Sequence, residues 1–385
     1  DLLRAIAEAS HDARPPRDAI AALVAGKTPA QALKAGSLPN DETNLGLLQQ
    51  LGETSRLLTE QHEIPSILHA LDGGYVRPAP GGDLLRTPEI LPTGRNLHGF
   101  DPYRIPSRFA VKDGARQTER LLARYAVEGN PLPECIALVL WGTDNLKTEG
   151  GPIAQALALL GALPRFDGFG RLAGATLIPL EELGRPRIDV VMTLSGIFRD
   201  LLPLQTRLLA EAAYLAAAAD EPLEQNFVRK HALAYAEANG CDLEAASLRV
   251  FSNADGAYGA NVNYLIDSSR WDEGDELAET YTRRKCFAYG RSGKPMQQAN
   301  LLTSVLGNVD LAYQNLDSVE LGVTAIDHYF DTLGGISRAV GRARGTDVPV
   351  FIGDQTTGEG VVRTLAEPVA LETRTRRLNP KWYEG

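Results

Sequence analysis

Cys135-Ile-Ala-Leu-Val-Leu-Trp141, followed by Gly-Thr-Asp-Asn-Leu-Lys-Thr-Glu149-Gly150, is the stretch that decides the fold. Its first part is continuously apolar, which is typical of a strand covered on both faces. Residues 151–160 then have helical spacing, with Pro152 in the first turn. Ligands bind at the carboxyl ends of such strands, because helix N-termini converge there. We therefore expect a functional crevice after Trp141, and a polar loop with a helix cap is the alternative.

The rest of the chain extends this pattern of alternating strands and helices. Alternation of this kind predicts an α/β fold: a parallel, doubly covered sheet with helical flanking regions, in a multi-domain fragment. The predicted strands are 135–141, 175–180, 187–195, 248–251 and 348–352. The predicted helices are 116–128, 151–160, 201–219, 224–238, 274–282 and 295–308.

A chain of 385 residues exceeds one typical core, so we expect several domains. Residues 1–72 have helical periodicity, and 73–107 form a Gly/Pro-rich connecting segment. Residues 108–255 are the predicted α/β domain, and 256–385 a mixed α/β region that continues the site. The chain begins at Asp1 without an initiator Met, so we expect it to be a piece of a longer protein.

Composition excludes several classes of protein. A net charge of −10 argues against a general nucleic-acid binder, whose binding surface is basic. No apolar run reaches the roughly 18 residues that a membrane span needs. The three cysteines are scattered and form no CxxC pair, which predicts neither a disulfide framework nor a zinc site and fits a cytoplasmic location.

Three motifs resemble nucleotide-binding sequences, but the residues around them do not fit such a site. Residues 168–173 match G-x-G-x-x-A but follow a helix and precede a strand, the reverse of a dinucleotide site. Gly26-Lys27-Thr28 and Gly293-Lys294 each lack the first glycine of a phosphate loop. An α/β oxidoreductase or transferase that binds a nucleotide after Trp141 stays open as an alternative, and we expect no ATP site in this chain.

Several blocks together resemble the large porphyrin-binding subunit of magnesium chelatase, and the large component of the related aerobic cobaltochelatase shares some of them. The resemblance runs from about residue 70 to the end, and the blocks keep the family's order. They are residues 79–86, 91–96, 141–143, 183–189, 195–200, 226–231, 251–259 and 315–320. Ser252-Asn253 and Ser318-Val319-Glu320 look more like the magnesium branch than the cobalt branch.

The resemblance implies ATP-dependent insertion of Mg²⁺ into protoporphyrin IX, a step toward chlorophyll or bacteriochlorophyll. In that family two smaller AAA+-type subunits hydrolyse ATP, which agrees with the absent phosphate loop. A His-Gly-Thr-x-Glu type motif found upstream in the family does not occur here, so we expect the fragment to be inactive alone. A non-catalytic scaffold that docks the ATPase subunits is the alternative.

Metal insertion requires carboxylates for a hard, slowly dehydrating cation and a base for the pyrrole protons. Asp317 and Glu320 are the first candidates for both tasks, as metal ligands and as catalytic groups. Glu149 and His231 are the next candidates. For each residue taken singly, a helix cap or a surface role is the alternative.

The porphyrin is an apolar plate with two propionates, which favours an aromatic-walled cleft with arginines at one edge. Trp141 is the candidate aromatic wall. The candidate propionate partners stand in strand-end or Gly/Pro-rich contexts, and a structural ion pair is the alternative for each of them. They are Arg95, Arg187, Arg199 and Arg291.

Overall fold

The computed structural model describes residues 14–80, 90–98, 100–316, 322–356 and 360–380, and the chain divides into units 1–100 and 101–385. The first unit is helical around a small core of Ala19, Ala22, Ala32, Leu33 and Leu48. Its helices are α2 (Arg14–Val24), α3 (Pro29–Ala35), α4 (Glu42–Thr59) and α5 (Glu63–Leu71), and a short parallel pair joins β1 (Pro78–Pro80) to β2 (Asn96–His98).

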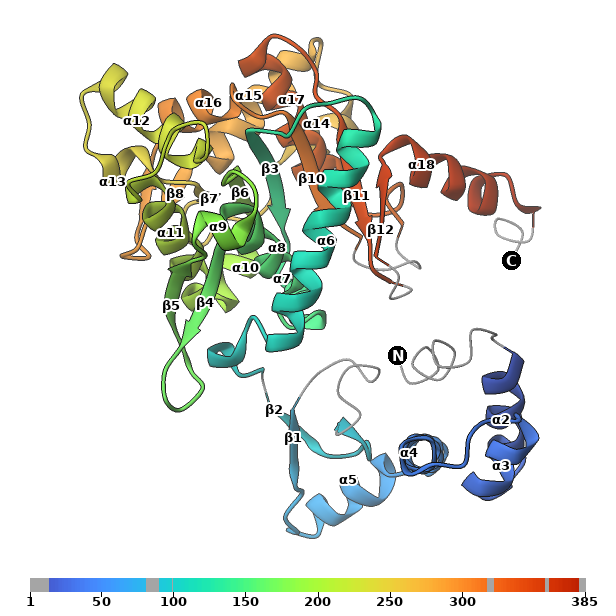
Figure 1. Ribbon diagram of the computed structural model, residues 1–385. Coiled ribbons are helices and arrows are strands. Elements are labelled where there is room, and N and C mark those ends of the chain that lie inside the picture. Colours follow the sequence, from blue (N-terminus) through green and yellow to red (C-terminus); the bar gives the residue numbers. More distant parts are fainter. Residues whose placement is uncertain (1–13, 81–89, 99, 317–321, 357–359, 381–385) are drawn as a thin grey trace. The chain divides into compact units, whose positions relative to one another are not determined.

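The second unit contains an eight-stranded sheet within its described residues (Figure 1). The strands, in spatial order, are β12 (Val361–Thr364), β11 (Val350–Asp354), β10 (Leu311–Asn315), β3 (Cys135–Leu140), β6 (Asp189–Leu194), β7 (Val250–Ser252), β8 (Phe287–Tyr289) and β9 (Pro295–Gln297). The run from β11 to β7 is parallel, and the outer strands β12, β8 and β9 are antiparallel. Every residue of β3 and β6 is buried, as their apolar sequences predict.

Helices cover both faces of this sheet, which confirms the predicted α/β class with a doubly covered parallel sheet (Figure 1). On one face α8 (Gly151–Leu160) packs against β3 and β6, and α6 (Arg108–Val127) and α11 (Pro203–Ala218) pack against α8. On the other face the core is shared with α15 (Gly274–Lys285), α16 (Ala299–Leu306) and α17 (Gly334–Arg344).

The second unit contains further helices among its described residues. They are η2 (Pro102–Arg104), α7 (Gly142–Lys147), α9 (Leu180–Leu183), α10 (Gly196–Leu201), α12 (Phe227–Asn239), α13 (Leu243–Ala246), α14 (Val262–Ser268) and α18 (Ala366–Glu372), with π-helical turns η3 (Tyr329–Leu333) and η4 (Thr373–Arg377). Among the described residues, no helix combines the length and the apolar character that crossing a bilayer requires.

Two sequence predictions differ from the structure. The predicted helix 295–308 begins only at Ala299, because residues 295–297 are β9, which pairs with β8. The predicted strand 175–180 belongs to β5 (Leu172–Leu177), which forms an antiparallel hairpin with β4 (Ala162–Phe166) outside the main sheet. In the second case apolar content identified a strand, and the local turn at 167–171 selected its partner.

The boundaries also fall differently along the chain. The connecting segment 73–107 spans the division at residue 100. Regions 108–255 and 256–385 share one sheet, since β10 pairs with β3 on one side and β11 on the other. The two regions therefore form a single unit rather than neighbouring domains.

Candidate functional site

The order of the parallel strands reverses between β3 and β10, and an open α/β sheet binds ligands where this happens. From β3 the chain adds β6 and β7 on one side, and it then returns to add β10 and β11 on the other. Trp141 follows β3, and Leu316 follows β10. We call the carboxyl ends of these two strands the switch-point edge.

A row of aromatic rings joins the two strand ends. The Trp141 ring lies 4.2 Å from the His328 ring with an interplanar angle of 36°, and the His328 ring lies 4.2 Å from that of Tyr329. The Tyr329 hydroxyl donates to the carbonyl oxygen of Asn315 at 3.4 Å. The Trp141 Nε1–H is buried and has no acceptor among the described residues. Trp141, the candidate aromatic wall, therefore stands first in a row of three rings.

A buried amide network holds the end of β10 in place. Asn315 and Gln155 exchange hydrogen bonds through their side-chain amides at 3.0 and 3.2 Å. The Tyr313 hydroxyl donates to Asn315 Oδ1 at 2.9 Å, and Gln117 Nε2 donates to that hydroxyl at 3.3 Å. Burial raises the pKa of Tyr313 well above its ordinary value, so the phenol stays a neutral donor. Asn315 is thus positioned by three elements.

The first-choice candidates, Asp317 and Glu320, lie outside the described residues. The positions on either side of that segment are anchored. The Leu316 amide donates to the Gly353 carbonyl oxygen at 2.8 Å. On the other side of the segment, the Glu372 carboxylate accepts hydrogen bonds from the Val323 amide at 2.6 Å and the Thr324 amide at 2.8 Å. It also accepts one from the Thr324 hydroxyl at 2.7 Å. The described residues that flank 317–321 are therefore bonded to β11 on one side and to α18 on the other.

Next to the switch-point edge, the first turns of α7 and α10 pack directly together. Ser195 Oγ accepts from the Phe198 amide at 3.0 Å, capping α10, and from the Gly142 amide at 3.2 Å. A Cβ at position 142 would lie 2.8 Å from Ile197 Cγ2, which is closer than real contacts. Glycine is therefore required at the start of α7.

Lys285 is fully buried beneath the ends of β6 and β7. Its ammonium donates to the Leu194 carbonyl oxygen at 2.9 Å and to Asn253 Oδ1 at 2.8 Å. Burial lowers the pKa of Lys285 to about 7. Sequence reasoning missed this residue, because Lys285 ends the charged run that begins at Arg283, which is typical of a solvated helix face.

Arg199, a predicted propionate partner, is 6% exposed and binds inside the protein. Its Nη1 donates to the carbonyl oxygens of Ala254 and Ala257 at 2.8 and 2.9 Å, and its Nε pairs with Asp200 at 2.7 Å. These contacts hold the loop that follows β7. The predicted alternative, a structural ion pair, describes the observed contacts of Arg199.

Arg187 and Arg291 are likewise engaged by protein groups. Arg187 is buried, pairs with Glu221 at 2.7 Å and donates to the Gly161 carbonyl oxygen at 2.7 Å. Arg291 pairs with Glu244 at 2.9 Å. Its guanidinium carbon also lies 3.9 Å from the centroid of a tyrosine ring on α11. Neither guanidinium lies at the switch-point edge.

Two of the three remaining candidates, Arg95 and Glu149, lie in loops. Arg95, in the first unit, donates to the carbonyl oxygens of Leu91 and Pro92, each at 3.0 Å. Glu149 lies just after α7 with φ of 52°, a left-handed backbone that is uncommon for a non-glycine residue. Its carbonyl oxygen accepts from the Ser107 amide at 2.9 Å. Glu149 is half-buried and follows the same strand, β3, as Trp141.

His231 lies at the opposite, amino ends of β3 and β6. Its Nδ1 is 2.9 Å from Asp189 Oδ2 and its Nε2 is 3.3 Å from Glu134, while Arg249 pairs with Asp189 at 2.8 Å. Burial alone would raise the pKa of Asp189, but Arg249 and His231 lower it below its ordinary value. Cys135 lies close enough to share a metal with Asp189 and His231. Asp189 pairs with both His231 and Arg249, and burial raises the pKa of the Cys135 thiol, so the observed contacts are those of a buried ion-pair cluster.

The sequence of this chain is similar to the large subunits of known metal chelatases. The H-type magnesium-chelatase subunit of Rhodobacter capsulatus is 68% identical over 332 residues, which are 86% of this chain and 28% of that protein. Its counterpart in Cereibacter sphaeroides is 64% identical, over 89% of this chain and 29% of that protein. The aerobic cobaltochelatase protein CobN of Sinorhizobium sp is 35% identical, over 84% of this chain and 26% of that protein. The chain thus spans less than a third of the length of these relatives.

A solved structure shares the fold over nearly the whole chain. The catalytic subunit of cobaltochelatase from Mycobacterium tuberculosis superposes with a TM-score of 0.85 at 35% identity, covering 98% of this chain and 32% of that one. The model of the CobN/Magnesium Chelatase family matches residues 2–385. Both the sequence blocks and the sheet topology therefore lead to one assignment, and the chain belongs to the CobN/magnesium chelatase family.

Proposed function

We propose that this chain is part of the porphyrin-holding large subunit of a magnesium chelatase, which inserts Mg²⁺ into protoporphyrin IX for chlorophyll or bacteriochlorophyll synthesis. The observation that carries this proposal is the difference in identity between the two branches. Two H-type magnesium-chelatase proteins are 68% and 64% identical to this chain, whereas the cobaltochelatase protein CobN is 35% identical. The magnesium branch is therefore the better match, and cobalt insertion is the alternative.

The reaction takes place, in this proposal, at the switch-point edge. Mg²⁺ is a hard cation that keeps its water tightly, so carboxylates must receive it and help to remove that water. Two pyrrole protons must also leave the porphyrin, which requires a base. We assign the cation to Glu320 and its orientation, or acceptance of a pyrrole proton, to Asp317. Support comes from the hydrogen bonds of the flanking residues, Leu316 with Gly353 and Val323 with Glu372.

The macrocycle needs an apolar surface, and we assign this task to the aromatic row, in which Trp141 is half-buried and His328 and Tyr329 are buried. Glu149 is the second candidate base, because it follows the same strand as Trp141. The contacts of His231 support a structural role instead. The four predicted arginines have protein partners, so a propionate would need another cation.

The energy for insertion comes, in this proposal, from ATP hydrolysed by two smaller AAA+-type partner subunits in the cytoplasm. A phosphate loop leads from a strand into a helix, whereas Gly26 follows helix α2 and Gly293 lies in the turn between the antiparallel strands β8 and β9. A scaffold that docks those partners without contacting porphyrin is the competing interpretation.

The test is metal insertion by the intact large subunit with its partners, ATP and Mg²⁺, followed by porphyrin fluorescence. Glu320→Gln keeps the side-chain shape and removes the charge that Mg²⁺ requires, so insertion should fall at least tenfold while porphyrin affinity changes little. Glu181→Gln, at an exposed position on α9, is the matched control. Wild-type insertion by Glu320→Gln would place the chemistry elsewhere, and a large subunit that binds its ATPase partners but no porphyrin would favour the scaffold.

A further inference from the structure

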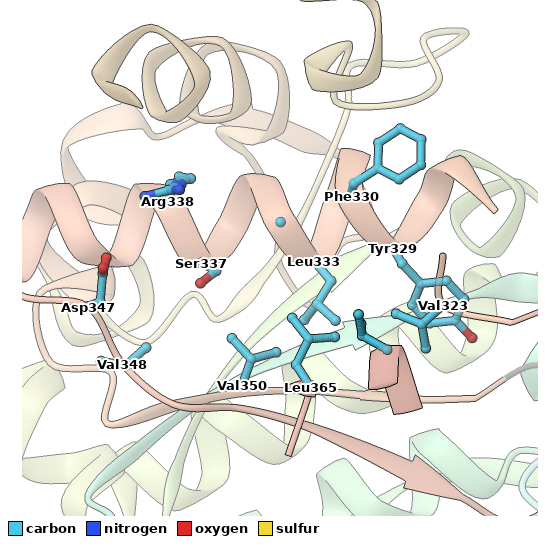
Figure 2. Close-up of a pocket in the computed structure, with 12 residues that line it drawn as sticks. Val323, Tyr329, Phe330, Leu333, Ser337, Arg338, Asp347, Val348, Val350 and Leu365 are labelled. Carbon is cyan, nitrogen blue, oxygen red and sulfur yellow. The ribbon is translucent and has the colours of Figure 1, made fainter. Parts of the chain in front are cut away.

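A pocket of about 440 Å³ lies between α17 and the β11–β12 end of the sheet (Figure 2). Leu333 and Ser337 extend from the helical side toward Val350 and Leu365 on the other side. Val369 of α18 adds a further apolar wall. The volume lies within the range of roughly 300–1,000 Å³ that small-molecule pockets occupy. This space is therefore large enough to receive part of a planar organic ligand.

One end of the pocket adjoins the switch-point edge. Val323 and Tyr329 lie together there in Figure 2. The Tyr329 ring continues the aromatic row through His328 to Trp141, and its hydroxyl reaches the end of β10. Val323 is the residue whose amide Glu372 holds. A ligand at the switch-point edge that is longer than the aromatic row would consequently extend into this pocket.

The opposite end of the pocket carries one cation and one anion, Arg338 and Asp347 (Figure 2). Both residues are exposed, and within the described part of the chain Arg338 makes no ion pair or hydrogen bond. A guanidinium at the end of an apolar slot is suited to the carboxylate of an otherwise apolar acid. Asp347 would repel that same carboxylate, so the two side chains have opposite effects on such a ligand.

We propose that this pocket receives one edge of the tetrapyrrole, with Arg338 binding a propionate. This inference rests on the proposed function, and it adds the location and orientation of the substrate. The apolar walls would contact a pyrrole ring and its alkyl substituents, and the aromatic row would lie under the centre of the macrocycle. Arg338 thereby supplies the cation that the four arginines chosen from the sequence do not.

The test measures binding of protoporphyrin IX, and of its dimethyl ester, to the intact large subunit by quenching of tryptophan fluorescence. Arg338→Gln should raise the Kd for the free acid about two- to fivefold, as expected for an exposed ion pair. Asp347→Asn should lower that Kd by a similar factor. Neither variant should alter the Kd for the ester, because the ester has no carboxylate. Arg116→Gln, at an exposed position on α6, is the matched control.

A second variant tests the apolar walls without relying on charge. Ser337→Trp fills the half-buried side of the slot and should weaken both the acid and the ester, by about tenfold or more. Unchanged Kd values in the Arg338 and Ser337 variants, with normal metal insertion, would refute the pocket and leave the proposed function intact. If the wild-type large subunit binds neither porphyrin, the proposed function itself fails.

Discussion

Glu372 offers the most direct test of how the segment after β10 is held. The carboxylate is 7% exposed and accepts three hydrogen bonds, from Val323 N at 2.6 Å, Thr324 N at 2.8 Å and Thr324 Oγ1 at 2.7 Å. Glu372→Ala leaves the buried Val323 amide without an acceptor, at a cost of about 1–3 kcal/mol. The two half-buried Thr324 donors add roughly 0.5–1.5 kcal/mol each. Local opening should thus become easier by about 2–6 kcal/mol.

Hydrogen exchange of peptides covering 322–326 in the intact large subunit measures this opening. Since 1.4 kcal/mol is about a factor of ten, Glu372→Ala should speed exchange there about thirtyfold or more. Glu372→Gln keeps one acceptor oxygen and should give an intermediate rate. Insertion should slow in the same order, with porphyrin affinity less affected. Glu181→Ala serves as the control.

The reasoning fails if Glu372→Ala leaves exchange at 322–326 unchanged, because the three hydrogen bonds would then contribute nothing to local stability. It also fails if the Gln and Ala variants behave alike, since the acceptor oxygen would not matter. Faster exchange with undiminished insertion would be informative in another way. It would separate the anchor from the chemistry and weaken the assignment of Asp317 and Glu320.

Two further predictions concern the residues around the switch-point edge. Trp141→Ala removes the first ring of the aromatic row and should raise the porphyrin Kd about tenfold, whereas Trp141→Phe should raise it about threefold, both measured by porphyrin absorbance. Lys285→Met tests how much the buried charge of Lys285 destabilises the fold. Burial lowers the pKa of Lys285 from 10.5 to about 7, so the charged side chain destabilises the folded state fully below pH 7. This destabilisation decreases as the pH rises from 7 toward 10.5, because the folded protein then holds the lysine neutral. The free energy of unfolding of the wild type should therefore rise by roughly 2–3 kcal/mol relative to that of the Met variant between pH 7 and 9. Thermal unfolding at several pH values measures this difference, and the same pH dependence for both proteins would contradict the prediction.

The sheet could be predicted because its strands are encoded locally. Residues 135–140 and 189–194 are apolar throughout, and a strand buried on both faces has that composition. β10 was harder, because its sequence Leu-Ala-Tyr-Gln-Asn mixes apolar and amide side chains. The Asn315 amide pairs with Gln155, and the Tyr313 hydroxyl accepts from Gln117; both partners lie far away in the sequence. Tertiary hydrogen bonding of this kind leaves no local periodicity, and the strands predicted from the sequence do not include 311–315.

In the candidate site too, features encoded by local sequence could be predicted, and features that depend on tertiary contacts could not. Trp141 could be placed at a strand end, since one local pattern specifies both the strand and the following helix. The arginines could not be assigned, because an arginine that binds carbonyl oxygens has the same sequence context as one that binds a ligand. Arg199 demonstrates this, since its partners lie in the loop after β7. Burial of Lys285 is equally invisible in a charged helical run.

The switch-point edge depends on contacts that are remote along the chain. Trp141 and Asn315 become neighbours only after the chain has formed β6 and β7 and returned to pair β10 with β3. The segment after β10 is then held by Gly353 of β11 and by Glu372 of α18, both still later in the sequence. A carboxylate that receives a hard cation must be held in place against the pull of hydration. We infer that β11 and α18 position the residues that flank 317–321. Removal of residues 351–380 from the intact large subunit should therefore stop metal insertion, measured by porphyrin fluorescence, while amide exchange in the β3–β6 pair stays slow; insertion at the wild-type rate would contradict this.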